Sequence, residues 1–323
     1  MVDKITRNPY CKIYSEKKTD NMLLENSEIN IALIDSGVDA SHSELYHNIK
    51  SQDSYSFINN SSPLIDKVGH GTEVAGILKQ VTPQSKIVPY KIIDVKESKA
   101  DSLNVIRAII KAVQNGSDII NLSLGTYKNI NYEKDKMLIK LYNEAIEYAH
   151  NNNVIIVSSL GNNNFNLDYQ FETNNIVHLP SYFNNVISIG ALKKNQKLAS
   201  FTNYHEYSSF FTCIGGDFIM QPNNKLNSKE LIYTTFPMNL KSPFLPSEKG
   251  YSLTAGSSIS AAMVTGLIAN LLLSSKTTLT IDDIKSTLNK SSTINHEYFF
   301  NHKISYRYIH VKTIYKLKGM NNL

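Results

Sequence analysis

The stretch LTAGSSISAAMVTGLIANLLL, residues Leu253–Leu273, places two adjacent serines, Ser257 and Ser258, before a long apolar run. The run has no polar face, which indicates a helix buried on all sides. The N-terminus of a helix presents unpaired N–H groups and the positive end of its dipole. Such a position suits a capping serine, and it equally suits a nucleophile whose reaction generates an oxyanion. The stretch alone leaves both interpretations open.

Apolar strands and amphipathic helices alternate through the rest of the chain. Apolar runs predict strands at residues 28–37, 85–94, 117–125, 154–162 and 185–192. Apolar residues at helical spacing predict helices at residues 69–81, 102–116, 136–153 and 280–291, besides the helix from Ser258. Continuous apolar strands separated by helices are typical of a parallel sheet covered on both faces. We therefore expect an α/β fold with one doubly wound, mostly parallel sheet and helices on both faces.

The sequence suggests a single folded domain over residues 28–323. Residues 1–27 are polar and irregular, and we expect an N-terminal extension there with neither a signal peptide nor a propeptide. The segment Phe218–Lys249 is rich in Asn, Lys, Pro and Ser, which predicts long surface loops. A short polar and aromatic tail is expected to close the chain.

The composition narrows the class of protein. A net charge of +5, from 33 basic and 28 acidic residues, is too diffuse to indicate a nucleic-acid partner. The apolar run from Ala261 to Leu273 is too short to span a bilayer. The two cysteines, Cys11 and Cys213, imply no disulfide framework. We expect a monomeric cytoplasmic protein that uses no cofactor and binds neither membrane nor nucleic acid.

Three polar residues occur at predicted junctions between strands and helices. Asp35 ends the first strand, His70 lies between two glycines at a helix start, and Ser258 begins the apolar helix. Each alone is as well explained by a capping or turn role. Together they supply a carboxylate, an imidazole and a hydroxyl where a doubly wound sheet places its active site. An imidazole can take the serine proton, and a carboxylate on the other ring nitrogen fixes the tautomer.

The motifs ALIDSGVDASHSEL, GHGTEVAGIL, INLSLG, SSLGNNN, ISIGAL, ASFTNY and GSSISAAMVTG resemble, in order, those of the subtilisin-like serine proteases, or subtilases. The resemblance implies a catalytic domain over residues 28–323, with Asp35, His70 and Ser258 as the triad. It implies that Asn162 donates an amide N–H to the oxyanion. It also implies that Ser123, Leu124 and Gly125 pair with the substrate backbone, which is β-augmentation.

Several positions depart from the family pattern. Ser257 stands for the usual Thr, Ala262 for the usual Pro and Glu73 for the usual His, and none of these changes removes a catalytic group. The four residues between Gly76 and Val81 leave no room for the calcium-binding loop that many subtilases carry there. Glu44, which matches a frequent ligand of that ion, is then expected to be a surface charge, and we expect no metal.

The approach to Ser258, IYTTFPMNLKSPFLPSEKGYSLTAGSS, resembles that of the lantibiotic leader peptidases. We therefore expect a serine endopeptidase whose substrate is a lantibiotic precursor. The alternatives are an intracellular protease that degrades proteins and a non-catalytic peptide-binding protein on the same scaffold. Asp168 and Glu172 follow Asn162, and they could receive a basic substrate side chain or could simply be solvated loop charges.

Overall fold

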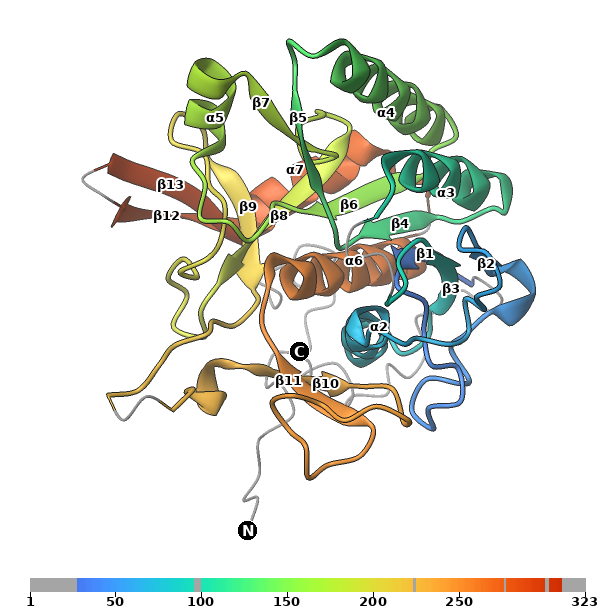
Figure 1. Cartoon of the computed structure of the whole chain (residues 1–323). Helices are drawn as coiled ribbons and strands as arrows, with labels where there is room; N and C mark the ends of the chain where they lie inside the picture. The colour runs from blue at the N-terminus through green and yellow to red at the C-terminus, as the bar shows by residue number, and fades with distance from the viewer. Residues whose placement is uncertain (1–27, 96–99, 223–224, 276, 300–301, 310–323) are drawn as a thin grey trace.

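The computed structural model describes residues 28–95, 100–222, 225–275, 277–299 and 302–309, and the predicted extension at residues 1–27 lies outside them. A sheet of nine strands forms the centre of the molecule (Figure 1). Its strands, in spatial order, are β12 (Ser292–Phe299), β13 (His302–Ile309), β9 (Phe210–Ile214), β8 (Val186–Leu192), β6 (Ile155–Ser159), β4 (Ile119–Leu122), β1 (Asn30–Asp35), β3 (Lys86–Lys91) and β2 (Tyr55–Ser56). All neighbours pair in parallel except β12 and β13, which form an antiparallel hairpin at one edge.

Helices cover both faces of this sheet, as the sequence predicts. The helices whose apolar side chains join the larger core cluster are α2 (His70–Val81), α6 (Ser257–Ser274) and α7 (Ile281–Ser291). The helices of the second cluster are α3 (Ser102–Gln114) and α4 (Glu133–Asn151). Within β1, Ile31 and Leu33 belong to the first cluster, whereas Ala32 and Ile34 belong to the second. Strand side chains alternate between faces, so each residue of this strand is buried on one side or the other.

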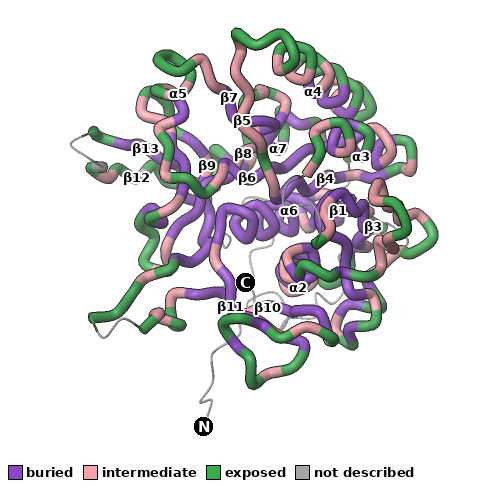
Figure 2. The backbone as a smooth tube through the Cα atoms, viewed as in Figure 1, coloured by how far each residue is buried: buried purple, intermediate pink, exposed green. Residues whose placement is uncertain are grey.

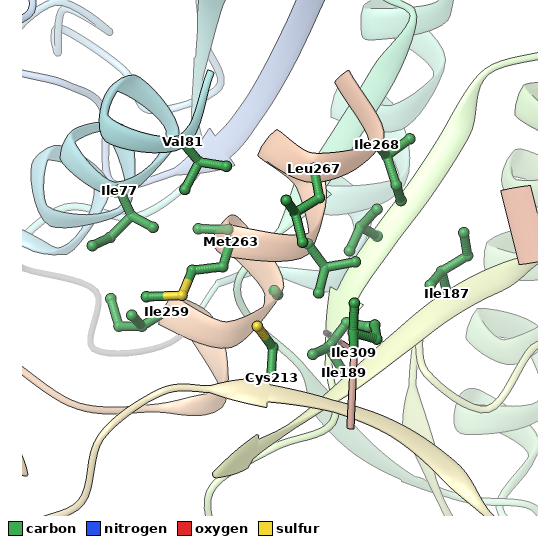
Figure 3. Packing of buried hydrophobic residues seen from close by; sticks show 14 of the residues in the cluster. Ile77, Val81, Ile187, Ile189, Cys213, Ile259, Met263, Leu267, Ile268 and Ile309 are labelled. Atoms are coloured by element: carbon green, nitrogen blue, oxygen red, sulfur yellow. The ribbon is translucent and has the colours of Figure 1, made fainter. Parts of the chain in front are cut away.

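Helix α6 is the most deeply buried helix of the first face (Figures 2 and 3). Ile259, Met263 and Leu267 pack between α2 and the central strands, and the free thiol of Cys213 lies beside them (Figure 3). Among the described helices, α6 alone is long and apolar enough to cross a membrane, but 83% of that span is buried inside the molecule. The apolar run is therefore accounted for as a core helix.

The remaining elements form two small sheets and three short helices. Antiparallel pairs join β5 (Thr126–Asn129) to β7 (Ile176–Leu179) and β10 (Ile232–Thr235) to β11 (Tyr251–Thr254). The short helices are α5 (Leu167–Asn174), η1 (Ser51–Asp53) and η2 (Ser228–Glu230).

Two predictions from the sequence are wrong in part. The segment Phe218–Lys249 is not only loop, because β10 lies within it and pairs with the strand that leads to Ser258. The chain end is not only a tail, because β13 adds to the central sheet beside β9. Its inward residues Ile304, Tyr306 and Tyr308 are buried, and their spacing of two is the strand pattern that the aromatic composition obscured.

Candidate active site

Asp35 and His70 are in direct contact at one end of β1. The Nδ1 atom of His70 lies 2.8 Å from Oδ1 and 2.9 Å from Oδ2 of Asp35. The carboxylate is fully buried, whereas about a third of the imidazole side chain is exposed. Burial lowers the pKa of His70, but the charge and hydrogen bond of Asp35 raise it by more, so the pKa lies above its ordinary value.

Two glycines allow α2 to begin against the turn that follows β1. Gly69 has a φ of +105°, a backbone conformation that side chains rarely adopt. A Cβ on Gly71 would collide with the carbonyl oxygen of Gly37, so only glycine permits this approach. The same close approach brings His70, the first residue of α2, against Asp35.

Asp66 holds the start of α2 against the turn that follows β1. Its carboxylate accepts hydrogen bonds from the backbone N–H groups of Val68 (3.0 Å), Gly69 (2.8 Å) and Thr72 (2.9 Å). It also accepts from the hydroxyl of Ser36 at 3.0 Å, which ties the helix start to the turn after Asp35. The sequence analysis missed Asp66, which lies three residues before the N-cap Gly69 and so outside the position of a standard capping signal.

Ser258 lies in the first turn of α6 and is almost fully buried. Its hydroxyl donates to the backbone carbonyl of Ser123 at 3.0 Å, and the hydroxyl of Ser123 donates to the carbonyl of Ser258 at 3.1 Å. Within the described residues, no hydrogen bond joins Ser258 to His70. The structure thus places the predicted nucleophile against the predicted substrate segment, and it records the Asp35–His70 contact separately.

Asn162 and Ser258 each bring a nitrogen atom close to the same position beside Gly256. The Oδ1 atom of Asn162 accepts from the backbone N–H (2.9 Å) and the hydroxyl (2.7 Å) of Ser257. These bonds direct the Nδ2 donor of Asn162 to the other side. A Cβ on Gly256 would lie 3.4 Å from that Nδ2 and 3.7 Å from the backbone nitrogen of Ser258. The absence of a side chain at Gly256 therefore leaves room for an oxygen near both donors.

Ser123, Leu124 and Gly125 connect β4 to β5 without belonging to either strand. Ser123 is buried by its contacts with Ser258, Leu124 is partly buried, and Gly125 is exposed. His178 of β7 lies against Gly125, because a Cβ on that glycine would collide with the Nε2 and Cε1 atoms of the ring. The sequence analysis missed His178, which no motif singles out.

Glu73, one turn after His70, is hydrogen-bonded to the strand that leads to the nucleophile. The hydroxyl of Thr254 donates to its carboxylate at 3.2 Å. Burial raises the pKa of Glu73 to about 7, although the charge of His70 and hydrogen bonds from Ser252 and Thr254 act in the opposite direction. The position where the family carries a histidine therefore holds a second titratable group close to His70.

Asp168 is fully engaged by the loop that follows Tyr204. It lies 2.7 Å from the Nδ1 atom of His205, and it accepts backbone N–H groups from Glu206 and Tyr207 at 2.7 and 3.0 Å. It is a loop anchor and not a solvated charge. Glu172 is exposed on α5, and the hydroxyl of Tyr207 lies 3.4 Å from it.

Helix α2 runs without interruption to Val81, where the sequence leaves no room for a calcium-binding loop. Glu44 is not simply a surface charge, because it is partly buried and accepts a 3.0 Å hydrogen bond from the hydroxyl of Tyr251. In the described part of the chain, no three His, Cys, Asp or Glu side chains gather closely enough to hold a metal ion.

Residues 26–308 match the model of the subtilase family, Peptidase_S8. The chain belongs to the subtilase family. The nine-stranded sheet with helices on both faces is the fold that its structural neighbours share.

Three similar proteins illustrate the range of its similarity to known proteases. The epidermin leader peptide-processing serine protease EpiP of Staphylococcus epidermidis is 29% identical over 80% of this chain and 62% of its own length. The chain thus spans less than two thirds of that relative. The structure of a lanthipeptide protease superposes with a TM-score of 0.79 at 30% identity, covering 91% of this chain and 88% of the other. Subtilisin DY of Bacillus licheniformis is 25% identical, over 83% of this chain and 85% of its own.

Proposed function

We propose that this chain is a serine endopeptidase in which Ser258 attacks the scissile carbonyl. His70 Nε2 takes the proton of the Ser258 hydroxyl and later gives it to the leaving amine. Asp35 holds the imidazole in one tautomer and stabilises the imidazolium. The attack requires the Ser258 hydroxyl to turn from the Ser123 carbonyl towards His70, a rearrangement expected when substrate replaces the free-enzyme contact.

The observation that carries this proposal is the convergence of two donors over Gly256. The Nδ2 atom of Asn162 and the backbone nitrogen of Ser258 lie 3.4 and 3.7 Å from the same position beside Gly256, and we assign that position to the developing oxyanion. Fixed donors of this kind stabilise the tetrahedral intermediate without reorganising during the reaction. We assign Ser123, Leu124 and Gly125 to binding the substrate backbone, because this segment contacts the nucleophile directly.

We propose further that the substrate is the precursor of a lantibiotic and that the enzyme removes its leader peptide. The support is the similarity to EpiP, which processes the epidermin leader, and to a lanthipeptide protease of known structure. Backbone pairing alone accepts many sequences, so selection of one leader needs side-chain contacts as well.

One experiment separates this proposal from its alternatives. The chain of residues 1–323 is offered a lantibiotic precursor, the same precursor with a truncated leader, and casein, with the Ser258→Ala variant in parallel. We expect cleavage of the full precursor only, because contacts with the leader contribute to kcat/KM. Efficient cleavage of casein would favour a degradative protease. Absence of turnover on every substrate would favour the non-catalytic peptide-binding protein. The cytoplasmic location, the monomeric state and the lack of membrane or nucleic-acid partners stay predictions.

A further inference from the structure

His178 lies in a gap between the two backbone segments that flank the nucleophile. It is on β7, opposite Tyr127 of β5, and only 5% of its surface is exposed. Its Nε2 atom sits where a Cβ on Gly125 would be, and 3.1 Å from where a Cβ on Gly161 would be. The tip of the imidazole therefore fills the base of the gap between Gly125 and Gly161.

The side chain that precedes the scissile bond must enter this gap. On the proposed function, the substrate backbone lies along residues 123–125 and its carbonyl oxygen points over Gly256 towards Asn162. The residue that carries this carbonyl, P1, then has the first segment on one side and Gly161 on the other. Its side chain extends between them and ends on His178.

A hydrogen-bonded tyrosine packs against the ring of His178. The hydroxyl of Tyr127 donates to Oδ1 of Asn163 at 2.9 Å and accepts from Nδ2 of Asn203 at 2.7 Å. The rings of Tyr127 and His178 lie 4.9 Å apart. These contacts tie β5 to the segment after Asn162 and hold Tyr127 beside His178.

The hydrogen bonds of His178 define which ring nitrogen is free. The hydroxyl of Ser181 lies 3.1 Å from the backbone carbonyl of His178 and 2.6 Å from Nδ1 of the ring. We assign the ring proton to Nδ1, because in that tautomer Nδ1 donates to the hydroxyl oxygen while the hydroxyl donates to the carbonyl, and both contacts are satisfied. In the neutral ring Nε2 is then an acceptor, and among the described residues it has no hydrogen-bond partner.

The environment keeps the ring of His178 uncharged, and the nearby carboxylate of Asp168 already has partners. Burial, together with the neighbouring His205, lowers the pKa of His178 to about 4. Asp168, the sequence candidate for a basic P1 residue, is already bonded to His205 and to two backbone N–H groups. A guanidinium or ammonium group buried here would have to compete with these partners for the Asp168 carboxylate.

We propose that His178 is the specificity-determining residue of the P1 pocket, and that it selects an uncharged side chain that donates a hydrogen bond, the carboxamide of Gln or Asn. The inference rests on the proposed endopeptidase activity. It names the side-chain chemistry that the same site accepts. A carboxamide N–H can bond to Nε2, whereas a methionine of similar length leaves that acceptor unpaired.

The test begins with a P1 profile of the full chain. A mixture of peptides of random sequence is digested and the new ends are read by mass spectrometry, with Ser258→Ala as the blank. Four peptides that differ only at P1, bearing Gln, Met, Phe or Arg, are then built on the best-cleaved sequence. We expect kcat/KM for Gln to exceed that for Met by about tenfold, the worth of one hydrogen bond to an otherwise unpaired acceptor.

Two variants separate the size of His178 from its hydrogen bond. In His178→Gly we expect the Gln-to-Met ratio to fall to about one, and cleavage after Phe to rise at least about tenfold because the gap is deeper. In Ser181→Ala the ring stays but its tautomer is released, so the ratio should fall without any gain for Phe. His150→Ala, on the distant helix α4, is the matched control and should keep the wild-type profile.

Each outcome decides the inference. If wild type and Ser258→Ala give the same products, the proposed endopeptidase activity is wrong and the inference falls with it. If wild type cleaves mainly after Arg, Lys or aromatic residues, the role of His178 is wrong while the peptidase stands. An unchanged profile in a folded Ser181→Ala variant would also refute it, even where His178→Gly does not fold.

Discussion

The hydroxyl of Ser257 should support catalysis through Asn162, without touching substrate. It donates to Oδ1 of Asn162 at 2.7 Å and accepts the backbone N–H of Gly161 at 3.2 Å. The backbone N–H of Ser257 makes a second bond to the same Oδ1 atom at 2.9 Å. Ser257→Ala removes the first bond and keeps the second, so Asn162 stays near its place but is held less firmly.

The magnitude follows from the value of one neutral hydrogen bond. A contribution of about 0.5–1.5 kcal/mol corresponds to a decrease in kcat of roughly 2- to 13-fold. Asn162→Ala, which removes the donor itself, should lower kcat by about 10²–10³, the range for an oxyanion donor in a relative. Both changes should leave KM nearly constant, because the donor acts only in the transition state. Ser257→Thr keeps the hydroxyl and should behave like wild type.

A double-mutant cycle on one peptide substrate tests the route of this effect. If Ser257 acts through Asn162, adding Ser257→Ala to Asn162→Ala should cause no further loss in kcat. Melting temperatures of the four proteins control for a general loss of structure, since Ser257 is fully buried. An equal loss of kcat in both backgrounds would refute the reasoning, because Ser257 would then act independently of the amide.

Four further expectations follow from the site. Ser258→Ala should lower kcat by about 10⁶, the cost of losing the nucleophile in a relative, while the circular dichroism spectrum stays unchanged; near-normal turnover would contradict its role. Glu73→Gln removes a negative charge that raises the pKa of His70, so the acid limb of the kcat/KM profile should move to lower pH; a shift to higher pH would contradict the assignment. Because the pKa of Glu73 is higher in the folded chain than the ordinary value of 4.5, wild-type stability should fall as pH rises from about 4.5 to 7, and Glu73→Gln should reduce that fall in thermal melts. Chelator should leave the melting temperature unchanged, since α2 is continuous to Val81, and a large drop restored by calcium would reveal a site missed here.

The central sheet was predictable because its strands carry a strong local signal. Within β1 the four residues from Ile31 to Ile34 are all apolar and are bounded by Asn30 and Asp35, as a strand covered on both faces requires. The small sheets were not predictable in the same way. Strands β5 and β7 have four residues each, and β5 is only partly buried, so its sequence lacks both a continuous run and a clear alternation.

In the candidate site too, some residues could be predicted from the sequence and others could not. Asp35, His70 and Ser258 are found from motifs, because their chemistry constrains the residues next to them. The contacts of Asp66 with Ser36 and of His178 with Gly125 join residues that are brought together by folding. Gly125 and His178 are far apart in the chain. A composition or spacing rule cannot reveal such pairs, so the pocket that receives a substrate side chain emerges only from the fold.

The two small sheets differ in how they connect to the helix that carries His70. The sheet of β10 and β11 is hydrogen-bonded to that helix. The hydroxyls of Thr234 and Thr235 on β10 donate to the carbonyls of Glu73 and Thr72, in the turn of α2 that follows His70. Changes in the segment Phe218–Lys249 therefore act on a strand that is bonded to the helix carrying the imidazole. The sheet of β5 and β7 has no such bond to α2 among the described residues, so its side chains can vary while the Asp35–His70 contact is kept. For a protease that must change its preferred side chain without losing activity, substitutions on β7 are the less disruptive route.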